Sequence, residues 1–131
     1  MVLMSQKNID LAVAYYQAMD RKDLTSMEKY LHSEVCLIGP MAELKGKEAV
    51  LNSVKNFVSI FKKLTIRAQC AGGDQVMLAY DLDCQAPIGL FRGAVLLTFQ
   101  EGLITRYELF YDASPFQKQR DEIFAKSADR S

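Results

Sequence analysis

The chain has 131 residues, of which 50% are hydrophobic and 24% are charged, and its 16 basic residues balance its 16 acidic ones. This length and composition predict a single globular domain over residues 1–131 with a hydrophobic core. The balance of charge excludes proteins that bind nucleic acid or anionic membranes through a strongly basic surface.

The N-terminal residues lack the apolar run of a signal peptide, and no segment approaches the roughly 20 apolar residues of a membrane span. We therefore expect a cytoplasmic protein. The three cysteines, Cys36, Cys70 and Cys84, are far apart and form neither a zinc motif nor a disulfide framework. We therefore expect each cysteine to act as a small buried hydrophobic residue. The sequence indicates no metal or cofactor.

The first half of the chain predicts three helices and one strand. Asn8 can cap a helix over 9–19, which is apolar on most sides and is therefore expected to be buried. Asp23 can cap a second helix that runs to about Tyr30, with His32 near its end. The apolar run 35–38, stopped by a Gly-Pro pair, predicts a buried strand.

The third helix is expected to begin at Gly46 and to run to about Phe61. Its apolar residues are spaced three and four apart, as in a helix with one buried face. They are Val50, Val54, Phe57, Val58 and Phe61.

After this helix the hydrophobic period changes to two, which is typical of strands. Strands are expected over 64–71, 75–85, 92–99 and 103–111, separated by a turn at 72–74, a loop at 86–89 and a hairpin turn at Glu101-Gly102. Ser114 can cap a last short helix that begins with Pro115. The expected core domain spans about 8–112, and 113–131 form a helical C-terminal extension.

Helices followed by a run of strands predict an α+β fold. We expect a cone-like curved antiparallel sheet wrapped around a long helix, with three N-terminal helices, a short C-terminal helix and one internal pocket.

Six short segments in this order resemble the SnoaL-like, nuclear transport factor 2-like family. They are AYYQAM at 14–19, KDL at 22–24, YLHSEV at 30–35, LKGKEA at 44–49, FQEGLI at 99–104 and FYD at 110–112. The resemblance covers about 8–112 and implies the cone fold. Its families include ketosteroid isomerases, polyketide cyclases, epoxide hydrolases, dehydratases and proteins without catalytic activity, so fold does not decide function.

The resemblance places the oxyanion-binding tyrosine of a ketosteroid isomerase at Tyr15. The general base of that reaction would fall at Gly39 and the second carboxylate at about Val95. Because this isomerisation needs a base within reach of the substrate proton, we expect no ketosteroid isomerase activity. A buried helical tyrosine is also a common core residue, so Tyr15 has a packing interpretation as well.

The last strand has two faces, and a slip of one residue would exchange them. One face carries Tyr107, Leu109 and Tyr111. The other carries Ile104, Arg106, Glu108, Phe110 and Asp112, and an arginine between carboxylates could polarise a substrate or activate water. We favour the tyrosine face as the inner one, because burying the charged row would require full pairing of every ion.

The expected pocket is apolar, with several phenol hydroxyls. Its expected lining is Tyr15, Met19, Phe57, Phe61, Leu78, Tyr80, Leu97, Tyr107 and Tyr111. Met41 near the mouth could add an adaptable wall. The leading hypothesis is the binding of a small hydrophobic ligand in this pocket.

Two alternatives remain open. One is an isomerase, cyclase or hydratase that uses Tyr15 with Asp112 or Glu108 as catalytic residues. The other is a non-catalytic dimeric interaction module. The resemblance, together with the mixed composition of the outer sheet face, implies a homodimer through that face, which would carry polar and apolar residues. These are Met77, Ala79, Asp81, Asp83, Arg106 and Phe110.

Overall fold

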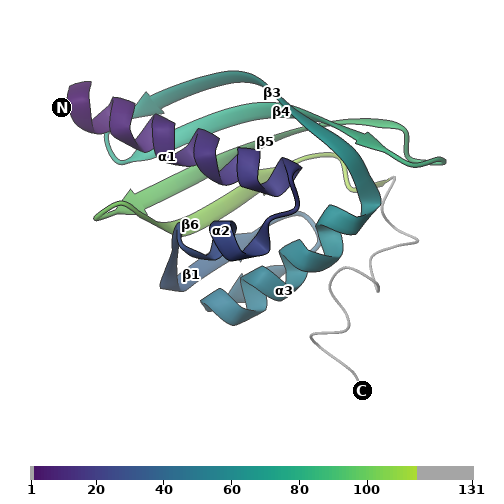
Figure 1. Ribbon diagram of the computed structural model, residues 1–131, viewed down its shortest axis with the longest axis horizontal. Helices are drawn as coiled ribbons and strands as arrows, with labels where there is room; N and C mark the ends of the chain where they lie inside the picture. The colour runs from purple at the N-terminus through teal and green to yellow at the C-terminus, as the bar shows by residue number, and fades with distance from the viewer. Residues whose placement is uncertain (1, 115–131) are drawn as a thin grey trace.

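A computed structural model describes residues 2–114 as an α+β fold in which helices cover one face of a curved six-stranded sheet (Figure 1). The α+β class and the cone-like sheet are as predicted. The elements are α1 (Val2–Asp20), α2 (Leu24–Glu28), β1 (Leu31–Ile38), β2 (Glu43–Lys45), α3 (Lys47–Phe57), the 3₁₀ helix η1 (Val58–Ile60), β3 (Phe61–Gly72), β4 (Gln75–Cys84), β5 (Leu90–Gln100) and β6 (Leu103–Phe110).

The sheet has the strand order β2-β1-β6-β5-β4-β3. It is mixed, whereas the sequence predicted an antiparallel sheet, because β1 pairs in parallel with β6. The other neighbouring strands pair in antiparallel fashion. Alternation within a strand reports which face is buried but not the direction of the partner strand, so this pairing was not accessible from the sequence pattern.

The first two helices differ from the prediction mainly at their ends. The helix α1 begins before Asn8, which lies inside it and is buried rather than capping it. The predicted cap of α2 is confirmed, since the Asp23 carboxylate accepts a hydrogen bond from the amide of Ser26 at 3.1 Å. Because α2 ends at Glu28, His32 lies in β1, where its Nδ1 accepts a hydrogen bond from the amide of Glu34.

The third helix starts where predicted but ends four residues earlier. Gly46 occupies its N-cap position with φ of +97°, a conformation that glycine adopts without strain. The helix α3 ends at Phe57, and Phe61 is the first residue of β3. The side chain of Phe61 is still buried, but it points from a strand and not from the helix.

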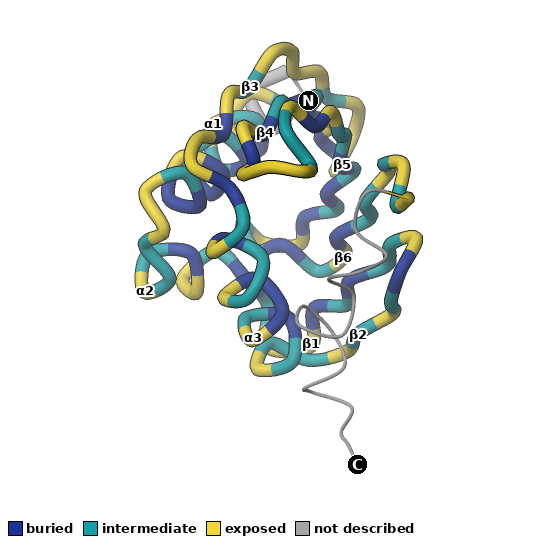
Figure 2. Tube along the Cα trace, turned by 90° about the vertical axis from the view of Figure 1, so that its right-hand side faces the viewer, coloured by how far each residue is buried: buried dark blue, intermediate teal, exposed yellow. Residues whose placement is uncertain are grey.

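The predicted strands are all present, and burial alternates along β4 as expected, whereas most of β3 is exposed. Along β4 the buried residues are Val76, Leu78, Tyr80, Leu82 and Cys84. Across the whole fold, exposed positions lie mostly at the periphery of the trace (Figure 2). The hairpin turn at Glu101-Gly102 is confirmed, with positive φ at both residues as this tight turn requires. The expectation that the cysteines are buried holds only for Cys84. It is wrong for Cys70, which lies on an exposed stretch of β3, and for Cys36, which is half-buried in β1.

The helices divide the inner face of the sheet between them. The helix α1 packs against β3 and β4, and α3 packs against β1, with α2 between the two helices (Figure 1). The buried side chains of helices and sheet meet in one core. The predicted C-terminal helix from Ser114 onward lies outside the described residues.

Candidate functional site

A small cavity lies in the core between α1, α3 and the inner face of the sheet. Its volume is about 30 Å³, which is space for roughly two water molecules. Its lining comes from α1, α3, four strands and two residues outside them, Met41 and Tyr111. The lining residues are Tyr16, Met19, Leu37, Met41, Ser53, Val54, Phe57, Tyr80, Phe91, Tyr107, Leu109 and Tyr111. None of these side chains is acidic or basic, so the polar groups at this cavity are tyrosine and serine hydroxyls.

Three tyrosine hydroxyls meet at one wall of the cavity. The hydroxyl oxygen of Tyr107 lies 3.3 Å from that of Tyr15 and 3.4 Å from that of Tyr16. Tyr107 comes from β6, whereas Tyr15 and Tyr16 are consecutive residues of α1. All three side chains are essentially inaccessible to solvent. Tyr107 and Tyr16 line the cavity, and Tyr15 stands behind them.

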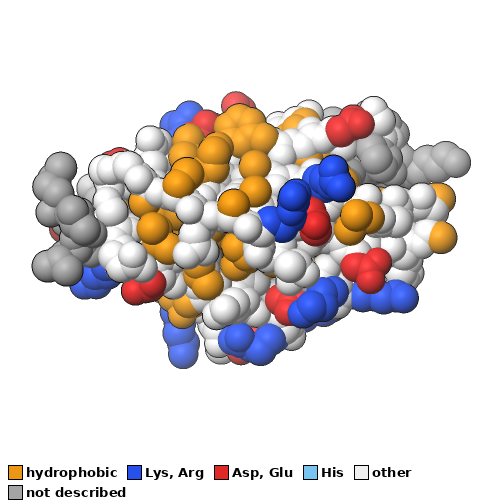
Figure 3. Space-filling model, turned by 90° about the horizontal axis from the view of Figure 1, so that it is seen from above, with side chains coloured by type: hydrophobic (Ala, Val, Ile, Leu, Met, Phe, Trp, Pro, Cys, Tyr) orange, Lys and Arg blue, Asp and Glu red, His pale blue; other side chains and the backbone are white. Residues whose placement is uncertain are grey.

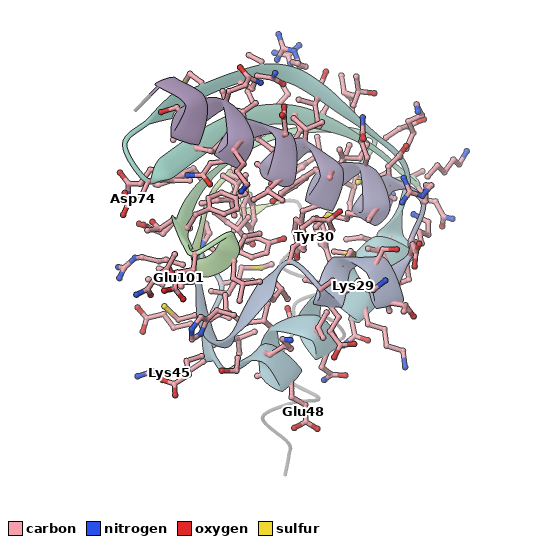
Figure 4. The ribbon with its side chains drawn as sticks, turned by 60° about the vertical axis from the view of Figure 1, so that its left-hand side comes forward. Lys29, Tyr30, Lys45, Glu48, Asp74 and Glu101 are labelled. Carbon is pink, nitrogen blue, oxygen red and sulfur yellow. The ribbon has the colours of Figure 1, made fainter. Side chains whose placement is uncertain are left out.

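The rings of this cluster pack edge to face or tilted. Tyr15 lies with its ring centroid 5.7 Å from that of Tyr107, at an interplanar angle of 82°. On its other side it meets Tyr30 at 6.3 Å, a residue labelled in Figure 4 beside the end of α2. Tyr16 packs against Tyr80 at 5.3 Å. Such contacts fix ring orientation, and therefore the directions of the hydroxyls.

Burial keeps these phenols protonated. Desolvation raises the pKa of Tyr15 and Tyr16 well above the ordinary value, and the neighbouring Tyr107 raises both further. Desolvation also raises the pKa of Tyr107, although the hydrogen bonds from Tyr15 and Tyr16 act in the opposite direction. The hydroxyl of Tyr107 is therefore neutral near neutral pH and keeps its proton.

The position of Tyr80 depends on a glycine in the neighbouring strand. Tyr80 in β4 pairs with Gly93 in β5. A Cβ atom at Gly93 would lie 3.0 Å from the Cε1, Cζ and hydroxyl oxygen atoms of Tyr80. The missing side chain thus provides the space for the tyrosine ring that forms one wall of the cavity.

The structure brings together five of the residues predicted from the sequence to line the pocket. Met19, Phe57, Tyr80, Tyr107 and Tyr111 all line the cavity. The other four are buried in the core away from it: Tyr15, Phe61, Leu78 and Leu97. Leu78 and Leu97 lie toward the β3–β4 turn, where α1 covers the sheet.

Sequence reasoning missed several lining residues. Tyr16 occupies the lining position expected for Tyr15, because successive residues of a helix differ by about 100° in direction. Phe91 lies just before the predicted start of its strand. Val54 was on the predicted apolar stripe of α3, and its spacing from Phe57 was the available signal. Leu109 was on the favoured inner face of its strand, between Tyr107 and Tyr111, and that position was the available signal. Nothing in the sequence pattern singled out Leu37 or Ser53 as lining residues.

The charged residues proposed for catalysis lie elsewhere. The Glu108 carboxylate forms an ion pair with Arg106 at 3.0 Å on the outer side of β6. Asp112 is exposed beyond the end of β6, and its carboxylate accepts a hydrogen bond from the amide of Ser114. The structure therefore does not bring Tyr15 together with either carboxylate. The inner face of β6 is the tyrosine face, as the sequence favoured.

The two positions at which a ketosteroid isomerase would carry carboxylates are also apolar in their surroundings. Val95 is fully buried opposite Leu109. A Cβ atom at Gly39 would lie 3.5 Å from the side chain of the cavity-lining Leu109.

Within residues 2–114 no three His, Cys, Asp or Glu side chains gather closely enough to hold a metal ion. None of the described helices is long and apolar enough to cross a bilayer.

Comparison with known proteins identifies a family and a set of similar folds. A family model described as a SnoaL-like domain matches residues 12–107. A search of curated proteins gave no significant match. A steroid delta-isomerase from Pseudomonas aeruginosa is similar with a TM-score of 0.74 and 20% identity, over 89% of this chain and 88% of that chain.

Two further solved structures are similar. TerC, crystallised with polyporic acid, has a TM-score of 0.74 and 17% identity, over 88% of this chain and 98% of that chain. A de novo designed protein with a curved β-sheet has a TM-score of 0.80 and 17% identity, over 90% of this chain and 94% of that chain. At these identities the similarity shows the fold alone.

Proposed function

The chain belongs to the SnoaL-like domain family, and from this premise we propose that it binds an uncharged, small hydrophobic molecule in the cavity beside Tyr107. The observation that carries this proposal is the lining itself, which joins an apolar wall to a cluster of phenol hydroxyls and lacks any acidic or basic side chain. Fold alone would not support it, because this fold serves many functions.

The lining selects against charged ligands. A carboxylate or ammonium group placed there would lose its hydration without gaining a counter-ion, which costs several kcal/mol. A carbonyl or ether oxygen needs only one donor. The Tyr107 hydroxyl can supply it, since its oxygen already accepts from Tyr15 and Tyr16 and its own proton is left to donate.

Binding of anything larger than water requires the cavity to expand. Met19 and Met41 are unbranched side chains that repack readily, and both line the cavity. Phe57, Leu109 and Tyr111 are only partly buried and form the side of the cavity nearest the surface. We therefore expect the ligand to enter between these residues, with side-chain movement and little change of the sheet.

Support for a small-molecule ligand also comes from two structural relatives. One is named a steroid delta-isomerase, and TerC was crystallised with polyporic acid. Neither name transfers a substrate to this chain, but both associate a small organic molecule with a protein of this fold.

The experiment uses the neutral fluorophore N-phenyl-1-naphthylamine, displaced by two competitors with the same ring system. We expect 2-acetylnaphthalene to displace it and 2-naphthoate to do so at least about 100-fold more weakly, because only the second carries a charge into the apolar site. The variant Leu109→Trp, which fills the cavity, should abolish binding, and the outer-face variant Arg106→Gln should not. Equal displacement by both competitors, or no binding by the wild type, would refute the proposal.

We also propose that the chain forms a homodimer through the outer face of the sheet. In the described part of the chain all three helices lie on the other face (Figure 1). The outer face places Ala79, Ala94 and Phe110 in one cross-strand row, with Met77 and Leu96 beside them. Phe110 is 49% exposed and Met77 is 36% exposed, so the row forms a contiguous apolar patch, the kind of surface that marks protein interaction sites.

Charges of both signs border this apolar strip. Arg67 lies 3.6 Å from Asp81, and Arg106 lies 3.0 Å from Glu108. The space-filling view from above likewise shows hydrophobic side chains gathered among acidic and basic ones (Figure 3). A face that carries both signs can pair with a second copy of itself across a two-fold axis.

Light scattering tests the dimer directly. We expect twice the chain mass of 14.8 kDa for the wild type, and the monomer mass for Phe110→Glu. Thr25→Glu, on the exposed side of α2, is the matched control and should remain dimeric. A monomer mass for the wild type at high concentration would rule out the dimer while leaving the ligand proposal intact.

A further inference from the structure

Lys22 has a backbone conformation that lysine rarely adopts. Its φ is +60°, in the left-handed region that favours glycine. The amide of Asp23 donates to the carbonyl of Ala18 at 2.9 Å, and the amide of Lys22 donates to the carbonyl of Met19 at 2.9 Å. This pair of bonds forms a Schellman turn at the end of α1, in which the residue at the position of Lys22 is usually glycine. Lysine is therefore strained at this position where glycine would not be.

The side chain of Lys22 holds one residue of β3 in two ways. Its ammonium group donates to the carbonyl of Phe61 at 2.7 Å and lies 3.8 Å from the centroid of the Phe61 ring. Phe61 pairs with Cys84 in the sheet, but the amide of Cys84 donates to the carbonyl of Gly89. Lys22 therefore supplies a donor to the first carbonyl of β3 and a cation–π contact to the same residue.

Each of the two contacting residues, Lys22 and Phe61, is connected to a residue that lines the cavity. The Schellman turn includes the carbonyl of Met19, whose side chain lines the cavity from α1. The Phe61 ring packs against the ring of Phe57, with centroids 5.6 Å apart, and Phe57 lines the cavity from α3. A second bond beside it, from the amide of Leu64 to the Asp20 carboxylate at 2.7 Å, also joins the end of α1 to β3.

We infer that Lys22 is a positioning residue of the cavity, which sets the spacing of Met19 and Phe57 by holding the end of α1 against Phe61. Glycine would relieve the backbone strain but has no side chain to reach Phe61. The backbone strain at Lys22 is therefore the cost of having a side chain that reaches Phe61. Strained backbone positions of this kind are common at functional sites. The consequence for ligand affinity rests on the proposed function, whereas the consequence for Met19 does not.

Three variants separate positioning from stability. Lys22→Gly loses the contact to Phe61 and also loses the strain, Lys22→Met loses the contact and keeps the strain, and Lys22→Arg keeps both. We expect Lys22→Gly to unfold at a higher urea concentration than Lys22→Met. We expect both to bind N-phenyl-1-naphthylamine about 2- to 10-fold more weakly than the wild type, and Lys22→Arg to bind within about twofold.

A second measurement does not require a ligand. In spectra of protein labelled at the methionine methyl groups, the Met19 signal, assigned with Met19→Leu, should shift in Lys22→Gly and Lys22→Met but not in Lys22→Arg. Met77 on the outer sheet face is the internal reference and should not move. An unchanged Met19 signal in Lys22→Gly would overturn the inference, and so would wild-type affinity in that variant. Failure of the wild type to bind the fluorophore would refute only the proposed function, since the Met19 signal would still decide the inference.

Discussion

Tyr107 is the residue on which the polar side of the cavity depends. Its oxygen accepts from two phenols of α1, and it is 2% exposed. A phenol in this position acts as a donor toward the cavity and as an acceptor toward the core. Removing the Tyr107 hydroxyl should therefore affect both ligand binding and the fixed orientation of the Tyr15 and Tyr16 side chains.

We predict that Tyr107→Phe weakens binding of 2-acetylnaphthalene by about 0.5–1.5 kcal/mol, the usual net value of one hydrogen bond. Competition against N-phenyl-1-naphthylamine measures the change. Glu108→Gln is the matched control on the same strand, and it should leave binding nearly unchanged because Glu108 faces outward. An equal loss in both variants would place the ligand outside this cavity.

Gly93 sets the position of Tyr80 through close approach. Its φ is not positive, so alanine would fit the backbone, but the added Cβ would lie 3.0 Å from two ring carbons and the hydroxyl oxygen of Tyr80. We predict that Gly93→Ala lowers the free energy of unfolding by about 1–3 kcal/mol, as overpacking does. When Tyr80 is replaced by leucine, Gly93→Ala should lower the free energy of unfolding by much less. Equal losses with Tyr80 and with leucine at this position would show that the contact with Tyr80 is not the cause.

At the scale of elements, β6 carries an irregularity that the sequence pattern did not reveal. The register with β5 shifts between Thr98 and Phe99, which leaves Thr105 as an extra residue between Ile104 and Arg106. The Thr105 hydroxyl donates to the carbonyl of Thr98 at 3.2 Å. As a result Ile104 and Tyr107 are both buried, although strict alternation had placed them on opposite faces.

The start of β3 is a second place where an element boundary determines packing. Phe61 follows η1, is 3% exposed and contacts both Lys22 and Phe57. We predict that Phe61→Ala lowers the free energy of unfolding by about 3–5 kcal/mol, through lost burial and a residual cavity. Urea denaturation measures this change. The adjacent exposed Lys62→Ala should change it by less than about 0.5 kcal/mol, and a loss below about 1 kcal/mol for Phe61→Ala would contradict the packing described.

At the scale of the whole molecule, the buried tyrosines couple stability to high pH. Desolvation raises the pKa of Tyr15, Tyr16, Tyr80 and Tyr107, and burial raises that of Tyr111 to about 12. In the unfolded chain a tyrosine ionises at about 10. The folded state therefore holds these protons more tightly, and their contribution to stability is complete below about pH 10 and is lost as the pH rises toward 12 and above.

We predict that absorbance at 295 nm, which follows phenolate formation, rises together with the loss of the circular dichroism of the fold. The free energy of unfolding measured by urea denaturation should be nearly constant from about pH 7 to about pH 8.5 and should fall as the pH rises past about 10. Tyr111→Phe is the control with one partly buried phenol removed, and it should reduce the decrease only slightly. Ionisation of most tyrosines near pH 10 with the fold intact would contradict the buried cluster.

The sequence by itself determined the features that depend on local periodicity. The alternation of β4, the cap at Asp23, the turn at Glu101-Gly102 and the inward tyrosine face of β6 were all predicted, because each follows from a pattern within a few residues. The α+β class followed from the order of the elements. Five of the residues that line the cavity lie on helix or strand faces that the pattern predicted to be buried.

The tertiary structure decided what depends on contacts between distant segments. It placed β1 parallel to β6, brought Tyr16 and not Tyr15 to the cavity, and moved Phe61 from a helix to a strand. It also set the small volume of the cavity, since that volume is what remains after side chains from two helices and four strands have packed. A periodic pattern shows which face of an element is buried, but the depth and direction of each side chain depend on the elements packed against it.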